Sequence, residues 1–223
     1  MLILSFDCGN VKFGVSCIEI NENIWRDLQA VRESFEKLYV RNSRLKCSAE
    51  KYLPNVAEML QTYLRDMKKC FANFIKLHYL DVPEIALHKA TKLVKARALK
   101  TYLTMLDCKI AKIGKVDKVL IEFQMKKNVA TPGQAAQLQY HYSEIDSVLV
   151  STRKKSSIDL KGIKLADYLE KYKRSSYAKK LHTVDICERI LQKFDSYAKF
   201  DKLSTAQTKD ASDSIMQAIG YVR

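Results

Sequence analysis

The chain has 223 residues, of which 47% are hydrophobic and 29% are charged. This composition is typical of a folded domain and excludes disordered, collagen-like and disulfide-stapled chains. Lysine and arginine number 39 against 25 acidic residues, so the net charge is +14. Such a charge favours a polyanionic partner, and nucleic acid is the first candidate. The alternative is a basic protein that lysine keeps in solution.

The six cysteines and four histidines show neither Cys-x-x-Cys nor His-x-x-x-His spacing, so they predict no zinc site. Free thiols are typical of a reducing compartment. The apolar start, MLILSF, reaches Asp7 too soon for a signal peptide or a membrane span. We therefore expect an intracellular protein without a signal peptide, a membrane partner or a small-molecule cofactor.

The first half of the chain predicts strands and then helices. An apolar run at 2–6 and alternating residues at 11–20 predict a β-hairpin that turns near Gly9-Asn10. An ambiguous third strand lies around 24–32. Apolar residues then recur at helical spacing over about 43–113, which predicts two or three helices. Between residues 61 and 115 there are 12 basic and 4 acidic residues, so one face of these helices is expected to be cationic.

The second half alternates strands and helices. VDKVLIEF at 116–123 predicts a buried strand, and Thr131-Pro132 predicts the start of a helix that runs to about Ser143. A further strand is predicted at 147–152, followed by helices near 164–172 and 183–195 and a last helix from about Lys209. This order predicts an α/β fold with a mixed sheet.

Four acidic residues could carry chemistry, and the first two belong to strands. Asp7 ends the first strand, where mixed α/β sheets place their sites, although a turn-forming aspartate is the alternative. Glu122 interrupts the apolar run VLI-E-F. Burying an unpaired charge costs several kcal/mol, so this carboxylate must be neutral, paired or metal-bound unless its head reaches solvent.

Asp210 and Asp213 stand three residues apart in the last helix, which places both carboxylates on one helix face. Two adjacent like charges repel unless a cation lies between them. The alternative is that these acids favour a helix N-terminus through its dipole.

The four carboxylates could converge from three distant segments. Oxygen ligands of this kind suit Mg²⁺ or Mn²⁺. Two such ions, about 3.5–4 Å apart, can bind the attacking and leaving oxygens of a phosphodiester. A basic surface around an acidic, metal-dependent centre indicates a nuclease.

The order of these acids resembles that of RuvC-like Holliday-junction resolvases of the ribonuclease H-like fold, in particular the poxvirus and iridovirus resolvases. The matching stretches make up about a quarter of the chain and are FDCGNVKFGVSCIE at 6–19, VLIEFQMKKN at 119–128, GQAAQLQYHY at 133–142 and KDASDSIMQAIGYV at 209–222. The resemblance implies a ribonuclease H-like mixed β-sheet flanked by helices. It implies one nuclease domain over 1–223, with a helical insertion at 40–113.

The resemblance also implies a homodimeric endonuclease that processes recombination and replication intermediates. Its partner would be branched DNA, and paired symmetric nicks would resolve a four-way junction and leave 5′-phosphate and 3′-hydroxyl ends. Two Mg²⁺ or Mn²⁺ ions per site would be held by Asp7, Glu122, Asp210 and Asp213. The helix from Thr131 resembles the dimer-forming helix, and a viral origin would imply the host cytoplasm.

Several lysines are expected to bind DNA. Lys126 and Lys127 follow the strand that carries Glu122, where the family approaches the junction. The other expected DNA contacts are Lys12, Lys154, Lys155, Lys179, Lys180 and Lys209. For the two lysine pairs 154–155 and 179–180, a solvated lysine face is the alternative.

Two other functions remain open. A non-catalytic protein that binds branched DNA would explain the charge equally well, although it gives a buried Glu122 no purpose. Asp7, Gly9 and Gly14 also resemble the opening of actin-like ATPases and sugar kinases, but that fold needs two such domains and a second glycine-rich loop, for which 223 residues and 6 glycines are too few. A metal requirement for cleavage, but not for binding, would separate the nuclease from the binding protein.

Overall fold

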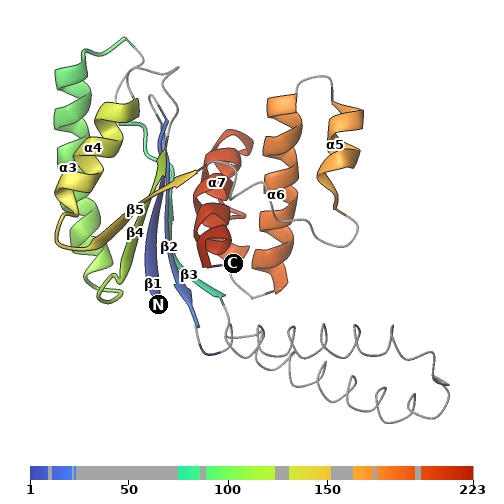
Figure 1. The fold of residues 1–223 in the computed structure, drawn as a ribbon, viewed down its shortest axis with the longest axis horizontal. Helices are drawn as coiled ribbons and strands as arrows, with labels where there is room; N and C mark the ends of the chain where they lie inside the picture. Colours follow the sequence, from blue (N-terminus) through green and yellow to red (C-terminus); the bar gives the residue numbers. More distant parts are fainter. Residues whose placement is uncertain are drawn as a thin grey trace, which may run out of the picture. The chain divides into compact units, whose positions relative to one another are not determined.

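Figure 1 shows the fold as a computed structural model of the chain. The chain divides into two compact units, one of Met1–Glu19 with Lys76–Arg223 and the other of Ile20–Ile75. The second unit lies almost wholly outside the described residues, so the sheet and helices are those of the first unit. The structure describes residues 1–9, 12–21, 23, 75–85, 89–123, 131–151, 163–172, 175–193 and 197–222.

A five-stranded mixed sheet forms the centre of the first unit, in the order β3-β2-β1-β4-β5. All six residues of the central β1 are buried, as expected for a strand that is covered on both faces. β2 runs antiparallel to β1, whereas β4 runs parallel to β1 and β5 parallel to β4. The strands are β1 (Leu2–Asp7), β2 (Gly14–Ile20), β3 (Ile75–Asp81), β4 (Lys118–Phe123) and β5 (Asp146–Ser151).

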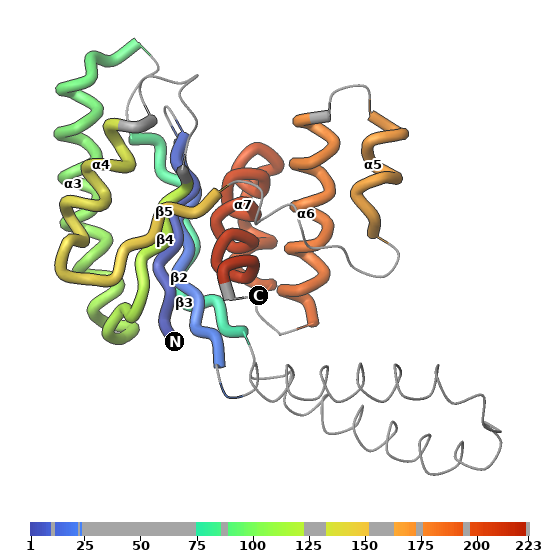
Figure 2. Tube along the Cα trace, in the orientation of Figure 1, coloured from blue at the N-terminus to red at the C-terminus, as the bar shows by residue number. Residues whose placement is uncertain are grey.

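Helices cover both faces of this sheet (Figures 1 and 2). One face carries α3 and α4, and the other carries α7, against which α6 and then α5 pack. None of the described helices combines the length and the apolar character that a membrane span requires. The helices are α3 (Lys92–Ile110), α4 (Thr131–His141), α5 (Leu165–Lys171), α6 (Ser175–Lys193) and α7 (Thr205–Val222), with a short 3-10 turn, η2, at Tyr197–Lys199.

Alternation along β1 assigns its side chains to the two layers. Leu4 and Phe6 belong to the apolar core that includes Leu103 and Leu106 of α3. Because neighbouring residues of a strand point to opposite faces, Ser5 and Asp7 lie on the face that α7 covers.

The position of α7 is fixed at several points along the helix. Ser204 and Gln207 form a capping box, in which the Ser204 hydroxyl accepts from the backbone N–H of Gln207 at 3.4 Å and the Gln207 side chain accepts from that of Ser204 at 3.1 Å. Further along, the amide of Gln217 donates to the carbonyl oxygen of Phe6 at 3.4 Å. The helix thus begins four residues earlier than predicted.

Most of the predicted elements are confirmed. The hairpin, the strands at 116–123 and 147–152, and the helices at 131–143 and 164–172 all correspond to elements of the structure. The helix predicted at 183–195 begins earlier, at Ser175. The mixed α/β sheet flanked by helices is confirmed.

The predicted helical insertion at 40–113 is wrong in its second half. Residues 75–81 are the edge strand β3, and 92–110 is α3, whose buried leucines belong to the core of the first unit. The first half of that insertion and the strand expected at 24–32 lie outside the described residues. A single nuclease domain over 1–223 stays a prediction.

Gly14 allows a close contact between the hairpin and α7, and this contact can be tested. A methyl group on Gly14 would lie 2.0 Å from the carbonyl oxygen of Asp210, so Gly14→Ala must push α7 away from the hairpin. We expect the free energy of unfolding to fall by about 1–3 kcal/mol, as measured by urea denaturation.

Gly133→Ala in α4 is the matched control, since a methyl group there meets nothing within 4 Å. Alanine favours helix over glycine by about 1 kcal/mol, so this variant should be as stable as the wild type or more stable. Wild-type stability of Gly14→Ala would contradict the close contact.

Candidate active site

The strand carboxylates Asp7 and Glu122 lie side by side. The last recorded pair between the parallel strands β1 and β4 is Phe6 with Ile121, and one further residue along each strand brings Asp7 beside Glu122. Phe6 and Ile121 both face the core under α3, so the two carboxylates share the opposite face, toward α7. Both side chains belong to buried residues, with Asp7 7% and Glu122 3% exposed.

The other two predicted acids come from α7. Asp213 is 7% exposed, and Asp210 lies one turn earlier on the same face. The first turn of α7 contains no acidic residue because the helix begins at Thr205. The explanation of these acids as partners of the helix N-terminus is therefore wrong.

Backbone packing brings the two pairs of acids to the same corner of the unit. Gly14 pairs with Asp7 across the hairpin, and the missing side chain of Gly14 makes room for the carbonyl oxygen of Asp210. Asp7 and Asp210 thus stand on either side of one glycine.

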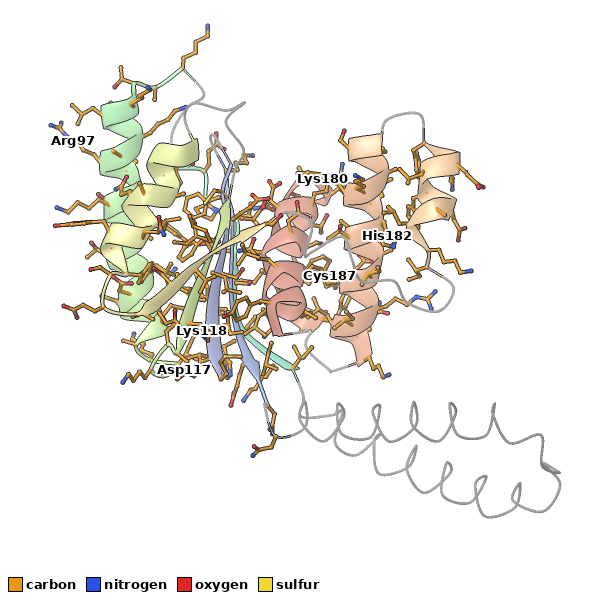
Figure 3. All side chains as sticks on the ribbon, in the orientation of Figure 1. Arg97, Asp117, Lys118, Lys180, His182 and Cys187 are labelled. Atoms are coloured by element: carbon orange, nitrogen blue, oxygen red, sulfur yellow. The ribbon has the colours of Figure 1, made fainter. Side chains whose placement is uncertain are left out.

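Lys180 of α6 connects the acids further. Its Nζ lies 3.3 Å from Oδ1 of Asp210 and 3.8 Å from Oδ2 of Asp213. Burial alone would lower the pKa of this ammonium, but the negative charges of Asp213, Asp210 and Asp7 outweigh that effect and raise the pKa above its ordinary value. Lys180 therefore stays protonated at neutral pH and offsets part of the repulsion between the carboxylates. Figure 3 labels Lys180 on α6.

From the sequence, Lys180 was expected to contact DNA phosphates together with Lys179, and its position beside the acids was not predicted. The spacing of residues in α6 does indicate that position. Lys180 precedes Thr183, Cys187 and Leu191 by three, seven and eleven residues, and all three are buried. Cys187 hydrogen-bonds to Ser212 of α7, so this row of α6 faces α7, and a lysine at its start is directed to the same neighbour.

The other predicted DNA-binding lysines have varied surroundings. Lys12 forms a 3.5 Å ion pair with Glu84, and Lys179 is exposed. The ammonium of Lys209, next to Asp210, lies 4.8 Å from the centre of the Tyr177 ring, a cation–π contact that holds a positive charge at the edge of the acid cluster. Lys126, Lys127, Lys154 and Lys155 lie outside the described residues.

The donor set suits a hard divalent cation. Asp7, Glu122, Asp210 and Asp213 offer only carboxylate oxygens, which are the ligands that Mg²⁺ and Mn²⁺ prefer. Within the described part of the chain, no three acidic, histidine or cysteine side chains are already arranged as a metal-binding group. The residue types fit such an ion, and the positive charge recorded beside them is the ammonium of Lys180.

Comparisons with known proteins support the fold. No protein-family model matches the chain, and no curated protein matches it. Among solved structures, fowlpox virus resolvase in complex with Holliday junction DNA aligns with a TM-score of 0.52 and 12% identity, over 100% of this chain and 97% of that one. RuvC of Thermus thermophilus aligns with a TM-score of 0.50 and 10% identity, over 100% and 96%. The chain therefore has the ribonuclease H-like fold of the RuvC-like resolvases.

Proposed function

We propose that this chain is a divalent-metal-dependent DNA endonuclease that resolves four-way junctions by paired symmetric nicks. The observation that carries the proposal is the strand register that sets the buried Asp7 beside the buried Glu122, on the face of the sheet that α7, with its buried Asp213, covers. Buried like charges are costly unless they serve a cation. The two solved structures of the same fold are a resolvase crystallised with its junction and RuvC, and the net charge of +14 suits the same partner.

The acids would hold the divalent ions. When bound, such ions neutralise the carboxylates, polarise the phosphodiester and lower the pKa of water. Asp7 and Glu122 supply oxygens from the rigid sheet, while Asp210 and Asp213 supply them from α7. Two ions per site, cleavage with 5′-phosphate and 3′-hydroxyl products, and a role in recombination and replication intermediates complete the proposal.

The cations around the acids would bind the scissile strand. Lys180, beside Asp210 and Asp213, would supply one ammonium for a phosphate of that strand. Lys209 would supply another, since it lies beside Asp210 with its ammonium over the Tyr177 ring. A homodimer would present two such sites to a junction, one for each nick. The dimer and an intracellular location stay predictions.

Replacing one acid tests the catalytic assignment. Asp7→Asn keeps the shape of the side chain and removes its charge. Changes to outer partners of metal ligands already cost about 10–100-fold, so we expect cleavage of a labelled four-way junction in Mg²⁺ or Mn²⁺ to fall by at least about 100-fold. Binding of the junction in EDTA should be unchanged or tighter, because a negative charge near DNA is lost.

Asp146→Asn is the matched control, since Asp146 pairs with Lys118 at the start of β5, at the other end of the sheet. It should cut as well as the wild type. Tight junction binding by the wild type without cleavage in either metal would instead indicate a non-catalytic binding protein.

Lys180→Gln tests the balance of charge in the cluster. The raised pKa of Lys180 means that its contribution to stability is fully present below the ordinary lysine pKa of 10.5 and is lost as pH rises through the higher folded-state value. For a half-exposed ion pair the contribution is about 1 kcal/mol at most. We expect the variant in EDTA to unfold about 2–4 °C below the wild type at pH 7, with a smaller difference above pH 10.5.

Metal addition provides the second readout for Lys180. Without the ammonium, the carboxylates should attract Mn²⁺ more strongly, so Mn²⁺ should raise the melting temperature of Lys180→Gln more than that of the wild type. If Mn²⁺ raised the melting temperature of the two proteins equally, Lys180 would have no effect on metal binding by the carboxylates.

A further inference from the structure

The positive charge of this protein is unevenly distributed. Residues 89–115 contain eight basic residues and one acidic residue, so about an eighth of the chain carries +7, half of the net charge. This segment includes α3 and the turn after it. Seven of its basic residues are exposed, six of which we call the α3 basic face: Lys89, Lys92, Arg97, Lys100, Lys112 and Lys115.

The single acid of the segment does not balance these charges. Asp107 accepts hydrogen bonds from the Tyr142 hydroxyl at 3.0 Å and lies 2.7 Å from Nε2 of His141. Its carboxylate is thus directed to the contact with α4. Among the described residues, no ion pair is recorded between the α3 basic face and a carboxylate. The charge of this face is therefore available to a partner.

The α3 basic face is separate from the candidate active site. α3 packs on the sheet through Leu99, Leu103 and Leu106, whereas the acids lie on the face that α7 covers. Figure 3 shows Arg97 on α3 and Lys180 on α6, on opposite sides of the sheet. Contact of one DNA backbone with Lys180 and the acids therefore does not account for the charge on α3.

We propose that the α3 basic face binds a duplex arm of the DNA through its phosphates, away from the strand that is cut. The proposal rests on the proposed function, because it assigns another part of the same DNA to a second surface. The 19 residues of α3 span about 28 Å. A backbone with a phosphate every 3.4 Å or so offers about eight phosphates per strand over this length.

Two other occupants fit less well. A second copy of the chain would bring two faces of +6 together, and their repulsion would oppose the contact. An anionic membrane would suit the charge, but the large apolar side chains that α3 exposes are only Leu93, Val94 and Met105, and three turns of helix separate Met105 from Val94 without another between them. The regular phosphates of a duplex need no apolar stripe.

A triple variant tests this surface on the full chain. Lys92→Gln, Arg97→Gln and Lys100→Gln together remove three exposed charges from α3, and EDTA keeps the junction uncut. Each lost phosphate contact lowers the slope of log affinity against log salt by roughly 0.9, so we expect the slope to fall by roughly 2–3 and the affinity near 150 mM salt to fall about tenfold. With saturating junction in Mg²⁺, kcat should be unchanged and KM raised.

A matched control removes the same charge elsewhere. Lys164→Gln, Lys171→Gln and Lys202→Gln change exposed residues that lie outside α3 and α4, and this variant should lower the slope by less than 1. Equal losses in the two variants, or no loss in the α3 variant, would overturn the proposal. An α3 variant whose salt slope for DNA binding is unchanged but whose sedimentation is altered would assign the face to a second copy. An unchanged slope with lost binding to phosphatidylserine vesicles would assign it to a membrane, and either result would overturn the proposal.

Cysteine labelling gives a direct readout of proximity. Cys108 is exposed and lies eleven residues after Arg97 and four before Lys112, on the same side of α3. With Cys47 and Cys70 replaced by serine, a photoactivated crosslinker on Cys108 should capture the junction. The same label on Lys164→Cys, in a chain with Cys108→Ser, should capture much less, and equal yields would overturn the proposal.

The two proposals can fail separately. Junction binding that depends on α3 without cleavage in any metal would overturn the nuclease and retain the α3 basic face. Metal-dependent cleavage by the wild type, with an unchanged salt slope in the α3 variant, would retain the nuclease and overturn the role of the α3 basic face.

Discussion

Asp7, Glu122 and Asp213 bring like charges into one buried corner of the sheet, and the free-energy cost of holding them there constrains the surrounding structure. Register between β1 and β4 fixes the first two carboxylates. Gly14, the capping box at Ser204 and the contact of Gln217 with Phe6 fix α7 and therefore the third. The ammonium of Lys180 offsets part of the repulsion. The sheet and the two helices α6 and α7 thus act together to support this one corner.

Much of the fold and of the candidate site could be predicted from the sequence. Glu122 within an apolar strand, and two acids on one helix face, are conflicts between charge and burial that a sequence displays directly. The strands at 116–123 and 147–152 were found from apolar runs and their flanking residues. Apolar runs and their flanking residues do not show which helices and strands pack against one another. The role of Lys180 depends on which neighbour α6 packs against, and hydropathy does not distinguish it from the adjacent Lys179.

The region before α3 shows how two periodicities can compete. Phe71, Phe74 and Ile75 have helical spacing, and extending that pattern made 75–81 a helix. The segment IKLHYLD also alternates, with Ile75 and Leu77 buried and Lys76 exposed, which is the strand pattern. Seven residues are too few for periodicity to decide, and pairing with β2 at the sheet edge decides the matter in the folded chain. In α3 the leucine spacing was long enough, and the helix was predicted correctly.

The contact between Gln217 and Phe6 joins residues 211 positions apart, and this distance has a consequence for a chain that is still being made. At about 5–20 residues per second, a ribosome needs roughly 10–40 s to pass from the first strand to the helix that completes the acid cluster. During this interval the nascent chain already carries Asp7, and later Glu122, but has no α7 to join them. The acid cluster therefore cannot assemble until the ribosome has synthesised α7, after the rest of the unit.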